Sequence, residues 1–287
     1  MQPIYVIIPT LLLGVLIYII GRSLSRFSQS FRQPQNNPQA FFEEIQKQPT
    51  HKKVVVCVGD SITHGVISAN YVEQLRARYI TQGYEFVNAG INGDLAWNVA
   101  QRLDKVIACR PNYVTLLIGT NDVNATYSDK VEAVYREGQK IPQTPDLAWY
   151  RHNVEQILDR LQTETQASIA VLQIPLLGED LSSEMNRLVD QYNATLQEIT
   201  EARHLPLLPL NVQMKAHLPH AHTPPAYTAD FSLMYGALLK HEVLRQSWDA
   251  ISKANRLALL TDHIHLNDRA AILIVEMVDE FLKPSRS

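Results

Sequence analysis

From residue 54 onward, short runs of apolar, β-prone residues alternate with longer segments whose apolar residues recur at helical spacing. The first run, residues 54–58, is apolar throughout, which is typical of a strand buried on both faces. Repeated alternation of this kind predicts a parallel sheet covered on both faces by right-handed crossover helices. The predicted strands are 54–58, 84–88, 113–118, 167–174 and 205–210, and the predicted helices are 70–82, 94–106 (capped by Asp94), 145–163, 184–203 and 267–282.

An uncharged apolar stretch, residues 3–20, precedes this part of the chain. As a helix it would be roughly 27 Å long, close to the hydrocarbon thickness of a bilayer. A secretory signal would need a basic start and a small-residue cleavage site, which the sequence lacks. A buried core helix is disfavoured because the stretch is apolar all round. We therefore predict an N-terminal transmembrane helix, with residues 1–22 as the membrane anchor.

Arg22, Arg26 and Arg32 follow the stretch, and no basic residue precedes it. The positive-inside rule then predicts a single-pass membrane protein with its bulk on the cytoplasmic face. Residues 23–51 are rich in Gln, Asn, Ser and Pro, which predicts a polar tether that allows a short helix at 38–48. The globular domain is expected to occupy residues 52–287.

The whole chain of 287 residues is 46% hydrophobic and 19% charged, an ordinary composition for a globular protein. Its net charge of −3 provides no basic field for nucleic acid. Cys57 and Cys109 lie in or beside apolar stretches without close spacing. They are therefore interpreted as buried free thiols, not as a metal site or a disulfide.

Ser61 is a candidate nucleophile because it follows the first predicted strand, in the turn Gly59-Asp60-Ser61. Open α/β sheets bind ligands beyond the carboxyl ends of their strands. A plain turn would have the same composition. A serine nucleophile also needs a base, an orienting group for that base, and donors for the oxyanion.

Asp262 and His265 stand three residues apart, just before the last predicted helix. Their side chains can meet in one turn, where the carboxylate would fix the imidazole tautomer and stabilise the imidazolium. His263 is the alternative base. His263 and His265, two positions apart, could also ligate a metal, but no cysteine or carboxylate cluster supports such a site.

Oxyanion donors are expected at the ends of the next two strands. A glycine in the segment 88–94, before a predicted helix, can present a free backbone N–H. Asn121 ends the third strand, and its side-chain amide could donate to the same oxyanion. Each is also a common turn residue. Together they follow the serine at successive strand ends.

This ordered set resembles the SGNH hydrolase superfamily, also called the GDSL esterases and lipases, over residues 54–282. The matching blocks are Gly59-Asp60-Ser61, the segment 88–93, Gly119-Thr120-Asn121-Asp122, and Asp262 with His265. The first block continues Ile62-Thr63 where leucine is common. His64 and His263 have no counterpart with a family role.

The resemblance implies a flavodoxin-like three-layer α/β/α sandwich with a five-stranded parallel sheet, and neither metal nor organic cofactor. It implies Ser61 as nucleophile, His265 as base and Asp262 as its orienting residue. It further implies an oxyanion hole from the backbone N–H groups of Ser61 and Gly93 and the side chain of Asn121.

Two stretches depart from the alternation. Residues 124–144 are polar and are predicted to form a loop on the carboxyl side of the sheet. Residues 217–260 exceed an ordinary connection and contain a predicted helix at 232–247. This insertion is either a lid or membrane-facing cap near the site, or a helical addition to the back face.

The expected function is a membrane-anchored serine esterase that hydrolyses carboxylic esters through an acyl-enzyme. Lipid, lysophospholipid and O-acyl glycan esters are the candidate substrates. The alternatives are an acyltransferase of the same fold and a non-catalytic, membrane-tethered binding module.

Overall fold

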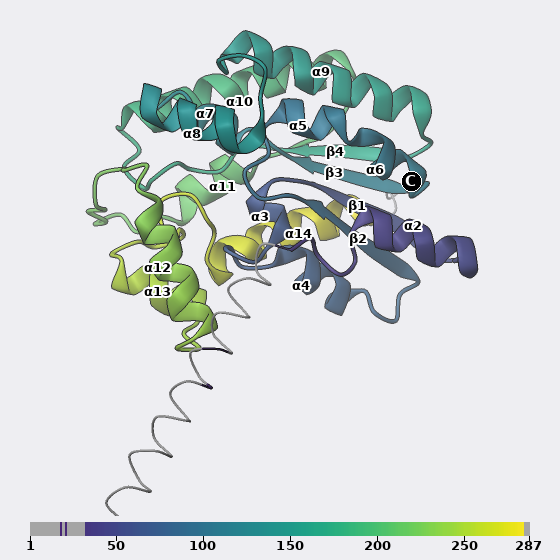
Figure 1. Ribbon diagram of the computed structural model, residues 1–287, viewed down its shortest axis with the longest axis horizontal. Helices are drawn as coiled ribbons and strands as arrows, with labels where there is room; N and C mark the ends of the chain where they lie inside the picture. The colour runs from purple at the N-terminus through teal and green to yellow at the C-terminus, as the bar shows by residue number, and fades with distance from the viewer. Residues whose placement is uncertain (1–17, 19–20, 22–31, 284–287) are drawn as a thin grey trace, which may run out of the picture.

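The computed structural model describes Tyr18, Gly21 and residues 32–283, and within them five strands form one parallel sheet (Figure 1). The strand order is β2-β1-β3-β4-β5, which is the flavodoxin-like order. The predicted α/β fold with a five-stranded parallel sheet is therefore confirmed. The strands are β1 (Lys53–Gly59), β2 (Tyr84–Gly90), β3 (Tyr113–Leu117), β4 (Ser168–Leu172) and β5 (Leu207–Leu208).

Helices cover both faces of this sheet (Figure 1). One face packs against α5 (Ala96–Gln101), α6 (Leu103–Ala108), α9 (Leu147–Glu164) and α10 (Glu184–Ala202). The other packs against α4 (Tyr71–Arg78), α11 (Leu210–His217), α13 (Trp248–Ala254) and α14 (Asp268–Leu282). The remaining helices of the described chain are α2 (Pro38–Lys47), α3 (Ser61–His64), α7 (Thr120–Asn124), α8 (Asp129–Gln139) and α12 (Phe231–Glu242).

The continuous apolar run of β1 serves both cores. Val54, Val56 and Val58 point into one hydrophobic core, whereas Val55 and Cys57 point into the other. All five are at most 4% exposed, so no position on the strand favours a polar residue. The interpretation of Cys57 and Cys109 as buried free thiols is confirmed.

The register brings the ends of three strands to one level. Gly59 at the end of β1 lies opposite Gly90 of β2 and Leu117 of β3. A Cβ at Gly90 would lie 2.2 Å from the backbone nitrogen of His64, so glycine lets α3 approach the sheet. The turns after β1, β2 and β3 therefore emerge side by side at the carboxyl edge.

The helix predicted at 94–106 is wrong as a single element, because the structure has α5 and α6 there. Asp94 is also not the cap, since Leu95 occupies that position. The Asp94 carboxylate instead accepts a hydrogen bond from Arg102 Nε at 2.7 Å. Arg102 also donates to the Gly59 carbonyl oxygen at 3.0 Å, and this pairing ties the break between the helices to the end of β1.

The loop predicted at 124–144 is wrong in its central part, which forms α8. Ser128 caps this helix by accepting from the Val131 backbone N–H. Val131 and Tyr135 are spaced for one helical face, and both are buried. They belong to a small apolar cluster with Leu95, Ala125 and Ile141, and burial in this cluster stabilises a helix that the mostly polar sequence does not indicate.

The helix predicted at 232–247 is confirmed, but the prediction places its C-terminal end too late. It ends at Glu242 as α12, and α13 begins at Trp248. Arg245 adopts a φ of 57° between them, which continuing α-helix does not allow. Ser247 then caps α13 through the Ala250 backbone N–H. Both helices lie at the same end of the molecule as α7 and α8 (Figure 1).

The short helix allowed at 38–48 is present as α2, and it packs on the domain. Phe41 is 6% exposed and belongs to the first core. Asn36 donates to the Phe86 carbonyl oxygen at 3.1 Å and accepts from the Asn88 backbone N–H at 3.0 Å. From residue 32 onward, the segment expected to be a tether thus contributes to the folded domain, because its few apolar residues find a place there.

Among the described residues, no helix has the length and apolar character needed to cross a bilayer. The predicted transmembrane stretch, residues 3–20, lies outside the described residues except for Tyr18. The N-terminal anchor therefore stays a prediction.

Candidate active site

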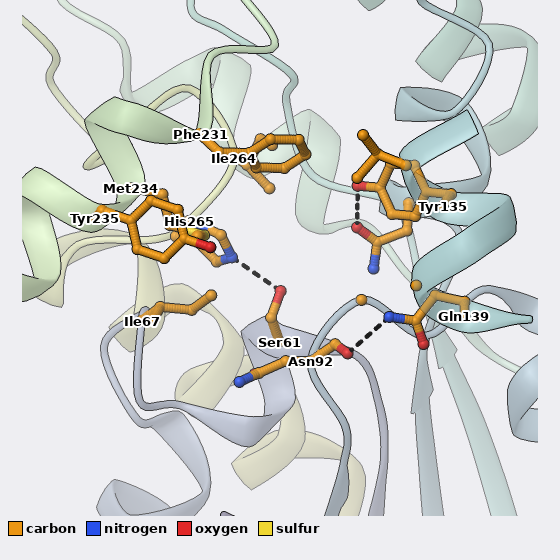
Figure 2. Close-up of a pocket in the computed structure, with 14 residues that line it drawn as sticks. Ser61, Ile67, Asn92, Tyr135, Gln139, Phe231, Met234, Tyr235, Ile264 and His265 are labelled. Atoms are coloured by element: carbon orange, nitrogen blue, oxygen red, sulfur yellow. Dashed lines mark hydrogen bonds between the residues drawn. The ribbon is translucent and has the colours of Figure 1, made fainter. Parts of the chain in front are cut away.

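Ser61 is the first residue of α3, directly beyond the carboxyl end of β1. Asp60 holds the turn, because its Oδ1 accepts a hydrogen bond from the Ile62 backbone N–H at 2.9 Å. The Ser61 side chain is 4% exposed, and its Oγ lies 2.8 Å from Nε2 of His265 (Figure 2). The serine and the histidine expected from distant parts of the sequence are thus hydrogen-bond partners.

Asp262 supports the other side of the His265 ring. Its Oδ2 lies 2.7 Å from His265 Nδ1, while its Oδ1 accepts from the backbone N–H groups of His265 at 2.8 Å and Ile264 at 3.1 Å. Burial by itself would raise the pKa of Asp262, but the His265 imidazole and these donors outweigh it and lower that pKa. An ionised carboxylate can only accept, so Nδ1 carries the proton and Nε2 can accept from Ser61.

A second set of hydrogen bonds holds the histidine loop against the serine turn. Leu266 N–H donates to Ser68 Oγ at 3.0 Å, and the Ala69 N–H donates to the Leu266 carbonyl oxygen at 2.9 Å. Ser68 and Leu266 are 198 positions apart in the sequence, so these contacts join two distant segments. They fix the separation between the two catalytic candidates within a buried region.

Glu179 is a buried carboxylate that the sequence interpretation missed. Its oxygens accept from the backbone N–H groups at positions 258, 259 and 260, at 2.7–3.0 Å. Its exposed fraction is 3%. His222, in the insertion, places its Nε2 within hydrogen-bond distance of the same carboxylate. Glu179 therefore fixes the segment that leads into Asp262, although an isolated glutamate after a strand carries no recognisable signal.

Gly93 and Asn121 line the same cavity as Ser61 and His265. Gly93 has a φ of 81°, a left-handed conformation that favours glycine at this position. The Asn121 amide donates to the Asp94 carbonyl oxygen at 2.9 Å. The structure thus gathers all five residues that the sequence nominated for the site at one edge of the sheet.

The two histidines without a family role, His64 and the alternative base His263, lie elsewhere. His64 faces the N-terminal segment, with its Nε2 2.8 Å from the carbonyl oxygen of Arg32. His263 is 2% exposed and packs its ring edge-on against Tyr227 at 5.8 Å. Burial lowers the pKa of both rings. Neither lines the cavity over Ser61, so His265 is the base candidate that the geometry selects.

Three aspartates are buried beneath the site. Burial raises the pKa of Asp60 to about 7 and that of Asp122 to about 8, and it also raises the pKa of Asp94. Asp122 accepts from the Ala96 backbone N–H with both carboxylate oxygens. Asp60 Oδ2 has no hydrogen-bond partner among the described residues. Asp60 and Asp122 therefore keep their protons to a higher pH than exposed carboxyl groups do.

The cavity over Ser61 has a volume of about 220 Å³ and is mostly apolar. Figure 2 shows Phe231, Met234 and Tyr235 of α12 on one side and Tyr135 and Gln139 of α8 on the other. The insertion therefore contributes a wall of the site, which favours the near-site interpretation over a back-face addition. In the described part of the chain, no group of three or more His, Cys, Asp or Glu residues could hold a metal ion.

Comparison with known proteins shows the family of this chain. Residues 57–271 match the GDSL-like Lipase/Acylhydrolase family. The chain belongs to this family. It is therefore a hydrolase that acts on ester bonds, and the predicted resemblance to the SGNH superfamily is confirmed.

The relatives of this GDSL-type esterase include an acetylxylan esterase from Geobacillus stearothermophilus. It is 28% identical over 164 residues, which cover 50% of this chain and 69% of that protein. The solved acetyl xylan esterase AlAXEase matches with a TM-score of 0.57 and 18% identity, covering 80% of this chain and all of its own. The structure of Axe2, from G. stearothermophilus, matches with a TM-score of 0.55 and 19% identity, covering 80% of this chain and 94% of its own. Likeness at these identities shows a shared fold.

The raised pKa of Asp122 predicts a pH-dependent stability. In the unfolded chain this carboxyl ionises near pH 4, whereas the folded protein keeps the proton to about pH 8. The contribution of this proton to the free energy of unfolding is therefore fully present below about pH 4 and is lost as the pH rises towards 8. For an ideal buried group this contribution is about 1.4 kcal/mol per pKa unit. Asp122→Asn should remove this contribution, so its unfolding temperature should fall less than that of the wild type between pH 5 and pH 8.

Asp104→Asn is the matched control, because the Asp104 side chain is 84% exposed. Its unfolding temperature should follow the wild-type curve over the same pH range. Equal slopes for the wild type and Asp122→Asn would contradict a proton held by the buried carboxyl.

Proposed function

We propose that this esterase uses Ser61 as its nucleophile, His265 as general base and Asp262 as the residue that orients the base. The observation that carries the proposal is the continuous line of contacts from Ser61 Oγ through the imidazole to the Asp262 carboxylate, at 2.8 and 2.7 Å. Nucleophilic serine needs this arrangement, because an isolated hydroxyl gives up its proton too reluctantly to attack an ester.

The reaction proceeds in two halves. His265 Nε2 takes the Ser61 proton while Oγ bonds to the ester carbonyl carbon, and the imidazolium then gives that proton to the departing alkoxide as the ester bond breaks. Water enters, His265 takes one of its protons, and the hydroxide attacks the acyl-enzyme. Breakage of the bond to Oγ releases the carboxylic acid, and Oγ regains its proton from the imidazolium.

The oxyanion formed in each half is stabilised by the backbone N–H groups of Ser61 and Gly93 and by the amide of Asn121. Support comes from the common cavity that these residues line. Donors held in place by the fold need no reorganisation during the reaction, which makes such a hole effective.

We further propose an ester with a short to medium apolar acyl group, longer than acetyl, as the substrate. Within the described part of the chain, no Asp, Glu, Lys or Arg lines the cavity, and Ile67, Phe231, Met234 and Ile264 do. A volume of about 220 Å³ lies below the roughly 300–1,000 Å³ of pockets for drug-sized ligands, so it suits a short to medium chain. The acetyl specificity named for the relatives would leave most of this apolar lining without contact.

The last part of the proposal is membrane attachment through residues 3–20, with the domain on the cytoplasmic face. It is supported by the uncharged sequence of that stretch and by the arginines that follow it. An apolar substrate pocket in a protein held at a bilayer would have its ester substrates close at hand.

Replacing the nucleophile tests the mechanism. Ser61→Ala should lower kcat for a p-nitrophenyl ester by about 10⁴-fold or more and abolish labelling by a fluorophosphonate probe. Ser182→Ala, at an exposed serine, should retain the wild-type kcat and the labelling. Labelling that persists in Ser61→Ala would remove Ser61 from the mechanism. Preferential transfer of the acyl group to an added alcohol would instead identify an acyltransferase.

A series of p-nitrophenyl esters tests the substrate class. We expect kcat/KM to rise from acetyl to butyryl and hexanoyl and to fall for palmitoyl, because the cavity is apolar but limited in volume. Met234→Trp should shift the optimum towards shorter chains by filling the cavity. Leu244→Trp is the control, because Leu244 is 61% exposed and does not line the cavity. A wild-type profile that is highest for acetyl would favour an acetyl ester.

Fractionation of the full-length chain tests the anchor. The wild-type protein should remain with membranes after a carbonate wash. Leu12→Arg combined with Leu16→Arg should release it, because each arginine at the centre of a membrane helix costs about 3 kcal/mol or more. Leu12→Phe with Leu16→Phe keeps the stretch apolar and should stay bound. A wild-type protein found in the supernatant would contradict the anchor.

A further inference from the structure

A line of buried hydrogen bonds runs from the insertion to the amide of Asn121. Tyr227 lies in the segment that connects α11 to α12, and its hydroxyl donates to Asn124 Oδ1. The Asn124 amide donates to the Tyr135 hydroxyl at 2.9 Å, and that hydroxyl donates to Asn121 Oδ1 at 2.8 Å. All four side chains are at most 8% exposed, so solvent does not compete for these contacts.

The direction of each bond follows from one carbonyl group. The Asp94 carbonyl oxygen can only accept, so the Asn121 atom 2.9 Å away is the amide nitrogen Nδ2. Asn121 Oδ1 then faces Tyr135, and the single hydroxyl proton of Tyr135 must point towards it.

The same reasoning fixes the outer half of the line. Because the Tyr135 proton is committed to Asn121, its oxygen must receive a proton, and the Asn124 amide supplies it. Asn124 Oδ1 therefore faces outward and accepts from the Tyr227 hydroxyl. Reversal of any one amide would set two donors or two acceptors against each other.

Asn121 Nδ2 carries two N–H groups, and only one of them donates to the Asp94 carbonyl oxygen. Asn121 lines the cavity over Ser61, so the second N–H can serve a group bound there. Donation by Tyr135 into Oδ1 polarises the amide, which strengthens its N–H groups as donors. Without Tyr135 the amide would keep only the bond to Asp94, and rotation about its side-chain torsions would carry Nδ2 away from the reacting carbonyl.

We propose that Tyr135 is a positioning residue for the oxyanion-stabilising amide of Asn121, and that Tyr227 links the insertion to this amide through Asn124. The inference rests on the proposed role of Asn121. Burial raises the pKa of both tyrosines well beyond the assay range, so their hydroxyls remain donors throughout. Tyr227 also packs against His263, which lies in the loop that carries the base, so one residue of the insertion contacts both sides of the site.

Tyr135→Phe is the principal test, because it removes the hydroxyl and keeps the ring. We expect kcat for the preferred p-nitrophenyl ester to fall about tenfold with KM nearly unchanged, since the lost bond acts on the transition state. In an Asn121→Ala background, Tyr135→Phe should have no further effect on kcat. Tyr227→Phe should give the same pattern with a smaller loss.

Tyr192→Phe is the matched control, because Tyr192 is 2% exposed and its hydroxyl has no partner among the described residues. It should leave kcat and KM unchanged, and thermal unfolding would confirm that each variant is folded. If Tyr135→Phe unfolds the protein, Tyr227→Phe carries the same comparison of kcat and KM.

Two outcomes separate this inference from the proposed function. If Asn121→Ala lowers kcat but Tyr135→Phe acts additively with it, or matches Tyr192→Phe, the positioning role is overturned and the catalytic assignment stands. If Asn121→Ala leaves kcat unchanged, the assignment of the oxyanion hole fails and the inference fails with it.

Discussion

The hydrogen bond between Ser61 and His265 joins positions 204 residues apart, and the rest of the site depends on it. Neither residue could hold the other in place alone, because each belongs to a turn whose backbone groups are buried and need partners. Ser68 and Leu266 satisfy one another across the two turns. Glu179 satisfies three consecutive backbone N–H groups upstream of the base. The contact that matters for chemistry is therefore maintained by hydrogen bonds that the fold has to make in any case.

The sheet explains why so much of the site could be predicted from the sequence. The apolar run of β1 is unambiguous because both of its faces are buried, and parallel strands in register end together. Residues that follow successive strands must then meet at one edge, so Ser61, a glycine of the segment 88–94 and Asn121 could be nominated from their positions, and the family resemblance then singled out Gly93. Asp262 and His265 were recognisable because their partnership is local, three positions apart in one turn.

The parts that could not be predicted are those that depend on a distant partner. The division between α5 and α6 accompanies the pairing of Asp94 with Arg102, and α8 depends on burial of Val131 and Tyr135. Glu179 acts only through a loop about eighty residues further along, so no spacing marks it. Tyr135 lies in a segment whose polar sequence suggested a loop, and its role follows only from the position of the Asn121 amide.

The insertion contacts three parts of the site, and the nature of these contacts distinguishes it from a simple cover. A cover would need only apolar side chains, such as Phe231 and Met234, over the substrate. This segment also places Tyr227 on Asn124 and His222 on Glu179, which are buried polar groups on the oxyanion side and the histidine side. A buried polar group is costly unless it has a hydrogen-bond partner. At Asn124 and at Glu179, the insertion supplies such a partner to a buried group of the α/β domain. A change in this segment should then alter the rate of the reaction as well as the choice of substrate, because the groups that shape the cavity and those that hold the catalytic apparatus belong to the same stretch of chain.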